Sequence, residues 1–405
     1  MVRPLHNFLG PKGKKTVSSL TKRALLLVAN YDSGVGYAWW LMESFWVKLA
    51  EVYHRQYQVI LAYPSISTLS SSISQASLLA MEEDFSDMRI AQVLKQCRFL
   101  RRNKVCIIYF SDQKTWHWRY VLYRLCGVRF IVIHDHTPGL RPPVRGLKAW
   151  LKRLIHQLPW LSADGVIGAT EFVRQRCVTN GCVPLSRSYV APNGLPSLTT
   201  PSKGADLHSI FDIPSERKIL VMSGRAHRYK GVDFIFRCVS HLRAIGQKNI
   251  HFLFIGDGPD LSTFSSLAKE MGISNCCTFA GRRDDVPSLL EGADIAIHPS
   301  RGEVGYSLSI LEYMRAGLPL VVPDNPSVCA ATVHMFSGMI YPDGDVHAAS
   351  EILQQLANDN ALRTKLGSQA KIAVKQYSLE ATHIALLDAF TKIVREGVVC
   401  PLAEA

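Results

Sequence analysis

The hydrophobic positions of this chain fall into compact runs that alternate with longer amphipathic stretches. In the first half, residues 24–30, 105–110 and 128–134 are runs of aliphatic, β-branched and aromatic side chains. Such runs are typical of parallel strands that are buried on both faces. Residues 163–169 and 189–191 continue the pattern. The first half is therefore predicted to be a parallel sheet with helices on both sides.

The same alternation starts again after a polar segment. Residues 198–209 have no hydrophobic periodicity, which is typical of a linker. From Lys218 onward, the strands ILVMSG, HFLFIGDG, CTFAG and DIAIHPS alternate with helical stretches. This order predicts a second doubly wound sheet. A chain of 405 residues is also long for one core, because cores stop growing at roughly 250–300 residues.

We therefore predict an α/β protein in which two Rossmann-like, doubly wound domains face each other across a cleft. A C-terminal helix is expected to pack back toward the first domain. The predicted segments are a basic tail (1–22), a first domain (23–197), a linker (198–215), a second domain (216–377) and the C-terminal helix segment (378–405).

Charge is distributed unevenly between the halves. Residues 1–200 contain 26 Lys and Arg against 11 Asp and Glu, a net charge of +15, whereas residues 201–405 contain 20 against 22, a net charge of −2. The basic half is expected to meet an anionic partner such as nucleic acid, an acidic lipid surface or a phosphorylated acceptor.

Cysteine usage and hydropathy predict the compartment. The ten cysteines form no CxxC pair and no zinc-type cluster, which is typical of buried thiols in a reducing cytosol. No apolar run approaches the roughly 20 residues that span a bilayer. The run ALLLVA is short and lies deep for a signal peptide, so a buried strand is the better interpretation. We expect the protein in the cytoplasm, with peripheral attachment to the inner face of the membrane as the alternative.

Residues 301–317 combine a loop glycine with a short helix. Gly305 gives the backbone freedom before the helix, Ser307 is suited to cap it, and apolar residues recur at helical spacing from Leu308. Gly317 is suited to end it. The first amides of such a helix have no internal partner and lie at the positive end of its dipole, so they can bind a diphosphate.

Two glutamates flank this predicted anion site. Glu303 lies in the loop and Glu312 in the helix. Carboxylates do not help to bind phosphate, but they accept hydrogen bonds from the hydroxyls of a ribose or a hexose. Together with the helix N-terminus they indicate a site for a nucleotide-sugar.

Other candidates follow the ends of predicted strands, where open α/β sheets bind their ligands. Arg225 and Lys230 lie in the loop after the first strand of the second domain, and two cations there would neutralise a diphosphate. The alternative is a solvated pair of loop charges. In the first domain, His134 and His136 follow a central strand. We interpret His134 as functional and His136 as more typical of a structural histidine.

The loop after the first strand contains Gly34 and Gly36. A dinucleotide-binding fingerprint would place a third glycine where this chain has Trp39, and no acidic residue ends the second strand. An NAD site is therefore not supported. A close approach of the backbone to some ligand and a simple tight turn both remain open.

Residues 141–161 form a basic amphipathic helix that admits two interpretations. Its composition is that of a helix lying in a membrane interface, and a core helix with a solvated basic side is the alternative. The basic residues are Arg145, Lys148, Lys152 and Arg153, and the apolar stripe consists of Leu147, Trp150, Leu151, Leu154, Ile155 and Leu158.

The order of motifs resembles the retaining glycosyltransferases of family 4, the glycosyl transferases group 1. In the second half, Gly224-Arg225 and Lys230-Gly231 are followed by FIGDGP, FAGR, ADIAIHPS and LEYMRAGLPLVV. In the first half, HD after a strand, ADGVIGATEFV and the PNG turn resemble the same family. The resemblance covers about residues 24–395 and implies a GT-B fold, with the acceptor site in the first domain and the nucleotide-sugar site in the second.

The resemblance implies an activity. It is the transfer of a hexose-type sugar from a nucleotide-sugar to a saccharide, with retention of anomeric configuration and with neither a metal nor a cofactor. The acceptor would be a lipid-linked saccharide or a polysaccharide precursor. The departing phosphate oxygen would take the acceptor proton, so the protein would supply positioning and charge stabilisation.

The resemblance also implies residue roles. Arg225 and Lys230 would bind the diphosphate and stabilise the leaving group, Glu303 would bind the transferred sugar and Glu312 the ribose. His134 would reach the sugar from the opposite domain. Further donor contacts would come from Gly36 at the phosphate, from Arg282 near the nucleobase, and from Gly305, Tyr306, Ser307 and Leu308.

One spacing departs from the family pattern. The family separates its two glutamates by seven residues, whereas eight separate Glu303 from Glu312, and strict spacing would place Val304 at the first position. We interpret the difference as a one-residue insertion, because the family order of glycine, aromatic, small residue and leucine is kept from Gly305 to Leu308.

Two other classes remain open. A nucleic-acid-binding protein or another basic surface-binding protein would account for the charged first half but not for the second-domain phosphate site, and no nucleic-acid module is recognisable. A nucleotide-sugar epimerase of GT-B fold would share the donor site but would not need a basic amphipathic helix.

Overall fold

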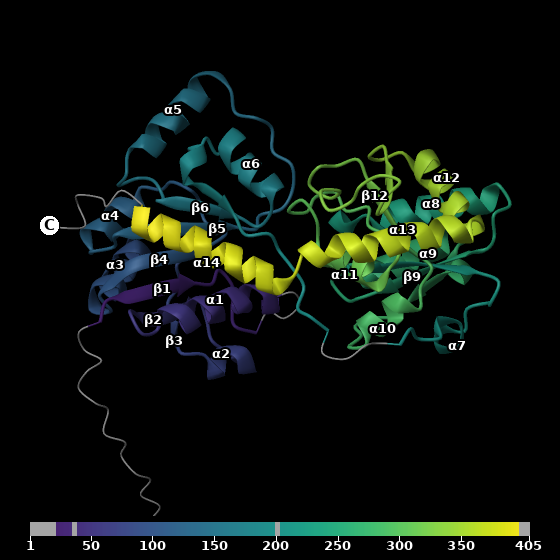
Figure 1. The fold of residues 1–405 in the computed structure, drawn as a ribbon, viewed down its shortest axis with the longest axis horizontal. Helices are drawn as coiled ribbons and strands as arrows, with labels where there is room; N and C mark the ends of the chain where they lie inside the picture. Colours follow the sequence, from purple (N-terminus) through teal and green to yellow (C-terminus); the bar gives the residue numbers. More distant parts are fainter. Residues whose placement is uncertain (1–21, 35–38, 199–202, 397–405) are drawn as a thin grey trace, which may run out of the picture.

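A computed structural model describes residues 22–34, 39–198 and 203–396 of the chain. The predicted basic tail therefore lies almost wholly outside the described residues, as does Gly36. Within the described residues the protein consists of two α/β domains that lie side by side (Figure 1).

The first domain is built on a seven-stranded sheet in which all strands are parallel. Its order is β3-β2-β1-β4-β5-β6-β7. Alternate residues of β1 enter two different cores: Leu25 and Leu27 pack under α1 and α14, and Leu26 and Val28 pack on the opposite side of the sheet. The strands are β1 (Ala24–Val28), β2 (Gln58–Tyr63), β3 (Leu79–Glu82), β4 (Val105–Ser111), β5 (Phe130–Asp135), β6 (Gly165–Gly168) and β7 (Ser188–Val190).

The second domain repeats this architecture with six parallel strands in the order β10-β9-β8-β11-β12-β13. It also has one apolar core on each side of its sheet. The two doubly wound sheets confirm the predicted fold class. The strands are β8 (Lys218–Ser223), β9 (Ile250–Ile255), β10 (Cys277–Phe279), β11 (Ile295–Ile297), β12 (Leu320–Pro323) and β13 (Gly338–Tyr341).

Helices cover both sheets. In the first domain they are α1 (Trp39–Tyr53), α2 (Ser71–Gln75), α3 (Ile90–Arg102), α4 (Arg119–Leu125), α5 (Gly146–Gln157) and α6 (Glu171–Thr179). The others are α7 (Leu207–Phe211), α8 (Val232–Ala244), α9 (Leu261–Glu270), α10 (Val286–Glu291), α11 (Leu308–Ala316), α12 (Val346–Asn358), α13 (Asn360–Ala373) and α14 (Leu379–Glu396). Short 3₁₀ turns are η2 (Leu185–Arg187), η3 (Arg228–Lys230), η4 (Ser274–Cys276) and η5 (Val374–Gln376).

The chain passes between the domains twice, and the two passages are hydrogen-bonded to each other. The Leu195 amide donates to the Tyr377 carbonyl at 2.9 Å, and the Leu379 amide donates to the Leu195 carbonyl at 2.8 Å. After the second passage α14 lies along the first domain (Figure 1), where Phe390 is buried in the core beneath it. Part of the segment predicted as a linker is instead folded, because α7 packs into the second domain through the buried Leu207.

Helix α5 lies at the outer edge of the first domain (Figure 1). Its buried residues are Ala149 and His156, whereas Leu147 is 72% exposed and Trp150 is 57% exposed. Leu151 and Leu154 are exposed as well. Four of the six stripe residues therefore face solvent, whereas Ile155 and Leu158 are half-buried, and the interpretation of α5 as a core helix is wrong.

Candidate active site in the interdomain cleft

A cleft of about 720 Å³ lies between the two domains, where the loops that follow the parallel strands meet. The first domain contributes Tyr31, Trp39, Trp40, Leu41, Met42, Asp112, His136 and Asn193 to its lining. The second domain contributes loop and helix residues that lie between Ser223 and Glu312. They include Arg225, Lys230 and Arg282. This is the position that open α/β sheets use for ligands.

The helix α11 begins at the cleft as predicted. The Ser307 hydroxyl accepts from the Ile310 amide at 3.2 Å, which confirms Ser307 as the N-cap, and Gly317 ends the helix with φ +79°. Leu308 begins the helix and lines the cleft. The free amides of the first turn therefore lie at the cleft, where a diphosphate would meet the positive end of the dipole.

Gly305 precedes this helix with φ +110°, a conformation that strongly favours glycine. A Cβ atom at Gly305 would lie 2.8 Å from the Thr170 hydroxyl of the first domain. The next residue, Tyr306, is buried and donates its hydroxyl proton to the Asn193 carbonyl at 3.0 Å. Gly305 and Tyr306 therefore fix how the loop before α11 meets the first domain.

Lys230 and Glu303 form a buried ion pair at the floor of the cleft. The Lys230 ammonium lies 2.6 Å from Glu303 Oε1, and His298 Nε2 lies 3.0 Å from the same oxygen. Lys230 ends the turn η3, whereas His298 directly follows β11. Three segments that are far apart in the sequence therefore meet at one carboxylate.

The pKa values in this cluster favour the ionised pair. Burial alone would raise the pKa of Glu303, but the Lys230 ammonium and the His298 hydrogen bond hold it well below its usual range. Burial likewise opposes the charge on Lys230, whereas the Glu303 carboxylate raises the pKa of Lys230 above its ordinary value. Burial lowers the pKa of His298. The site therefore carries a carboxylate with a fixed orientation and an ammonium at pH 7.

Glu312 lies one helical turn further along α11, on the wall of the same cleft. Burial raises its pKa to about 6, and the nearby Arg315 partly opposes this shift. Among the residues that the structure describes, none forms a hydrogen bond or ion pair with the Glu312 carboxylate. Glu312 is therefore available to accept hydrogen bonds from a ligand.

The remaining predicted cations lie at the cleft entrance. Arg225 follows β8, Arg282 follows β10, and both side chains are exposed and line the cleft. Next to Arg225 the backbone is tight, because a Cβ atom at Gly256 would lie 1.9 Å from the Gly224 carbonyl oxygen. This contact holds the loops after β8 and β9 together, so the GR and FIGDG motifs form one surface.

The prediction that His134 reaches the cleft is wrong. Strand β5 extends to Asp135, so His134 is still inside the sheet, fully buried and hydrogen-bonded to the Tyr109 hydroxyl. His136 is the first residue past the strand and lines the cleft. The imidazole of His136 is neutral at pH 7, because burial lowers its pKa despite the nearby carboxylates of Asp112 and Asp135.

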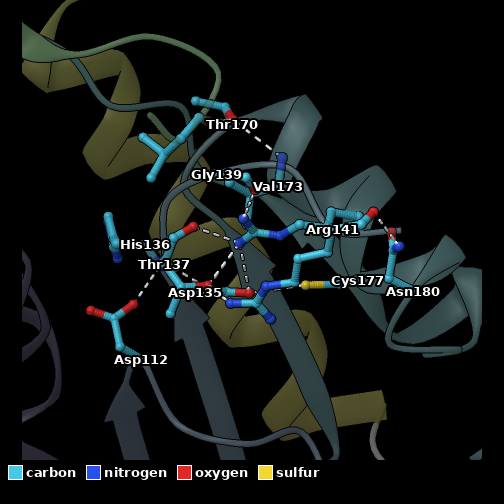
Figure 2. Close-up of polar contacts among 12 residues, drawn as sticks. Asp112, Asp135, His136, Thr137, Gly139, Arg141, Thr170, Val173, Cys177 and Asn180 are labelled. Atoms are coloured by element: carbon cyan, nitrogen blue, oxygen red, sulfur yellow. Dashed lines mark hydrogen bonds and ion pairs between the residues drawn. The ribbon is translucent and has the colours of Figure 1, made fainter. Parts of the chain in front are cut away.

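Asp112 is a cleft residue that the sequence analysis missed. It follows β4 with φ +54°, and its carboxylate accepts from the His136 amide at 2.5 Å and from the Tyr31 hydroxyl at 3.1 Å. Figure 2 shows Asp112 and His136 next to each other. Burial raises the pKa of Asp112. Its position past the carboxyl end of a central strand was the available signal, as it was for His298.

Buried polar atoms lie in this wall of the cleft. The two ring nitrogens of His136 and the Asn193 side-chain oxygen make no hydrogen bond of normal geometry within the described part of the chain, although the Asn193 side chain lies close enough to His136 to act on its pKa. Buried polar groups are nearly always paired with protein, water or ligand. The first-domain wall is therefore suited to a ligand that carries several hydroxyl groups.

Comparisons with known proteins agree with this geometry. Residues 205–373 match the family Glycosyl transferases group 1. The chain is 26% identical over 178 residues to the lipopolysaccharide core biosynthesis glycosyltransferase LpsE of Rhizobium meliloti strain 1021, and the match spans 44% of this chain and about half of that relative, 51%. It is 27% identical over 319 residues to the D-inositol 3-phosphate glycosyltransferase of Corynebacterium jeikeium strain K411, spanning 67% of this chain and 74% of the relative.

The fold has solved counterparts. The crystal structure of Anabaena Alr3699/HepE in complex with UDP superposes with a TM-score of 0.69 at 16% identity, over 91% of this chain and 100% of that one. The architecture is therefore that of the GT-B glycosyltransferases.

Proposed function

We propose that the protein is a retaining glycosyltransferase of family 4 that transfers a hexose-type sugar from a nucleotide-sugar to a saccharide acceptor. The observation that carries the proposal is the buried Lys230–Glu303 pair beside the free N-terminus of α11. An ammonium and helix amides suit a diphosphate, and the adjacent carboxylate suits sugar hydroxyls. HepE, which shares the fold, was solved with UDP and with UDP-glucose.

The roles that the resemblance implies are compatible with the positions of the side chains. Arg225 and Lys230 would neutralise the diphosphate and stabilise it as the leaving group. Glu303 would bind the transferred sugar and Glu312 the ribose, while Arg282 would lie near the base. His136 takes the place proposed earlier for His134, because it is the histidine on the cleft wall of the first domain.

Catalysis would depend on positioning and charge more than on a dedicated base. A departing diphosphate gains negative charge as the glycosidic bond lengthens, and fixed cations stabilise that charge without reorganising. In a retaining reaction the acceptor hydroxyl lies on the same side as the departing oxygen, which would take its proton. The protein then has to hold donor and acceptor in contact. We expect no metal or cofactor to be needed.

The first experiment is a calorimetric screen of UDP, GDP and ADP, with Arg225→Ala and Glu312→Ala as variants and Lys218→Met as the matched cation control. Micromolar binding of one nucleotide, lost in the two cleft variants and kept in the control, supports the donor site. Folded protein that binds none of the three nucleotides would refute the proposal. Transfer with the selected nucleotide-sugar, followed by NMR of the product anomer in the presence of a chelator, then tests retention and metal independence.

We further propose that the acceptor is lipid-linked and that α5 lies on an anionic membrane surface, on the inner face of the cytoplasmic membrane. The exposed Leu147, Trp150, Leu151 and Leu154 are flanked by Arg145, Lys148 and Arg153, which are exposed too. Exposed apolar side chains beside cations are the composition of an interfacial helix. The structure contains no helix, in the residues that it describes, that could cross a bilayer.

Vesicle sedimentation tests this surface. Trp150→Ser with Leu154→Ser should weaken binding to anionic vesicles. Ile372→Ser with Ile384→Ser removes two apolar side chains elsewhere that are at least as exposed, and should not. Equal loss in both pairs, or unchanged binding in the α5 variant, would contradict a membrane role for α5.

A further inference from the structure

The loop that carries Glu303 is attached to the opposite domain by its backbone. The Gly139 amide of the first domain donates to the Glu303 carbonyl at 2.9 Å, and the Thr170 hydroxyl donates to the Val304 carbonyl. The side chain of Val304 packs against the core of the first domain. Two consecutive carbonyl groups and one side chain of this second-domain loop therefore contact first-domain groups.

The two domains approach each other so closely that neither end of the loop has room for a side chain. A Cβ atom at Gly302 would lie 2.9 Å from the Gly139 Cα atom, and one at Gly305 would lie 2.8 Å from Thr170 Oγ1. The loop is thus held between two glycines that permit backbone contact. Glu303 lies between them, so its backbone is held by the first domain while its carboxylate is held by Lys230 and His298 of the second.

The first-domain side of this contact is rigid. Arg176 is buried and donates to the carbonyls of Thr137 and Gly139 at 2.6 and 2.8 Å, and it lies 3.3 Å from Asp135. Figure 2 shows Asp135, Thr137 and Gly139 gathered beside this contact network. Thr170 is itself fixed as the N-cap of α6, where its hydroxyl accepts from the Val173 amide at 3.3 Å.

We propose that Thr170 is a positioning residue that holds the backbone of the Glu303 loop across the domain interface, so that contact between the domains supports the orientation that Lys230 and His298 give to the sugar-binding carboxylate. The consequence for sugar transfer rests on the proposed function. The contact itself does not, because it is a property of the loop in the free protein. Thr170 touches no substrate in this scheme and acts through the position of Glu303.

The test compares Thr170→Val, which keeps the shape and loses the hydroxyl, with Thr170→Ser, which keeps the hydroxyl. Loss of the hydroxyl leaves the Val304 carbonyl without its donor in a half-buried position, which should weaken the contact by about tenfold. Hydrogen exchange of the peptide that contains residues 302–306 should therefore be about tenfold faster in Thr170→Val and normal in Thr170→Ser. Exchange that is equal in all three proteins would overturn the proposal.

A helix-cap control separates this effect from general destabilisation, because Thr170→Val also removes the N-cap of α6. Asp345→Ala removes the N-cap of α12, whose Asp345 side chain accepts from the Ala348 amide, and α12 does not line the cleft. This variant should leave exchange of the loop unchanged. If it accelerates exchange as much as Thr170→Val does, the effect is only lost stability and the proposal fails.

Turnover provides the second readout. With a nucleotide-sugar donor, kcat should fall about tenfold in Thr170→Val and recover in Thr170→Ser, while affinity for the free nucleoside diphosphate stays within about twofold. Loss of nucleotide affinity together with kcat would contradict a positioning role. If the wild-type protein binds no nucleotide, the proposed function is refuted. The hydrogen-exchange result would still show whether Thr170 holds the loop.

Discussion

The Lys230 ammonium lies 2.6 Å from the Glu303 carboxylate, and both side chains are almost completely withdrawn from solvent. The pair unites the loop after β8 with the loop before α11, and His298 completes it. A buried pair of this kind is weak evidence of stability, because desolvation of both charges offsets their attraction. Its position at the cleft supports the proposed role in ligand binding.

Lys230→Met should therefore damage both binding and stability. It leaves the Glu303 carboxylate buried without its counter-ion, and breaking a buried pair in this way costs about 3–5 kcal/mol. Chemical denaturation should show the loss, and nucleoside diphosphate affinity should fall in the same variant. Lys218→Met is the control, since Lys218 pairs with Asp294 at 3.3 Å in a partly exposed position. Equal destabilisation by the two variants would contradict the expectation that loss of Lys230 costs more because it leaves a buried carboxylate unpaired.

The pH dependence of donor binding should reflect Glu312. Its pKa is raised to about 6 because burial disfavours the carboxylate. Ribose hydroxyls donate to the ionised form, so nucleotide affinity should increase as the pH rises from 5 to 7 and a proton should be released below the pKa. Calorimetry in two buffers with different ionisation enthalpies measures this proton. In Glu312→Gln the affinity should be weaker and should rise less between pH 5 and 7, because only the terminal phosphate of the nucleotide then titrates, with a pKa of about 6.

The ionised Glu312 carboxylate should lower the stability of the fold, whereas an ordinary salt-bridged carboxylate raises it. A folded-state pKa above the unfolded value means that the ionised group destabilises the fold, and the loss appears as the pH rises through 4.5 to 6. Glu312→Gln should therefore be more stable than the wild type above pH 7, by at most about 2 kcal/mol, and not below pH 4. Thermal unfolding at both pH values checks this, and a Gln variant that is less stable at pH 8 would contradict it.

The fold and the ends of α11 could be predicted because their signals are local. Strands buried on both faces are hydrophobic throughout, and the cap Ser307 and the terminator Gly317 act within one helix. The position of His134 was mistaken because the end of β5 could not be located within one or two residues, and that shift decides which histidine meets the cleft. Asp112 was missed for a related reason, since only the folded sheet brings it beside His136.

The sequence also could not show what surrounds helix α5. Periodicity predicted the apolar stripe of α5 correctly, but it does not say whether a stripe meets the core or solvent. The answer depends on tertiary packing, which buries Ala149 and His156 instead of Leu147 and Trp150.

Asp112 should act on the acceptor side of the reaction. It belongs to the first domain, and its carboxylate is oriented by the His136 amide and the Tyr31 hydroxyl. Asp112→Asn keeps the shape but removes the charge, so kcat/KM for the acceptor should fall at least about tenfold while nucleotide affinity is unchanged. Steady-state kinetics with varied acceptor checks this. Asp212→Asn, at the end of α7 with a similar backbone (φ +52°) and outside the cleft lining, should leave acceptor kinetics unchanged.

Gly305 offers the sharpest test of the loop geometry, because the chain contains a matched control. Gly344 also has a positive φ, +82°, but a Cβ atom there would meet nothing within 4 Å, so Gly344→Ala should cost only the backbone strain of about 1–2 kcal/mol. Gly305→Ala adds contacts of 2.8 Å with Thr170 Oγ1 and 3.1 Å with the Phe172 Cβ atom, both in the opposite domain. It should therefore reduce turnover strongly, since the loop with Glu303 must move away from the first domain, whereas Gly344→Ala should leave turnover intact. Denaturation and turnover measured on both variants separate strain from displacement, and equal turnover in the two would contradict the close contact at Gly305.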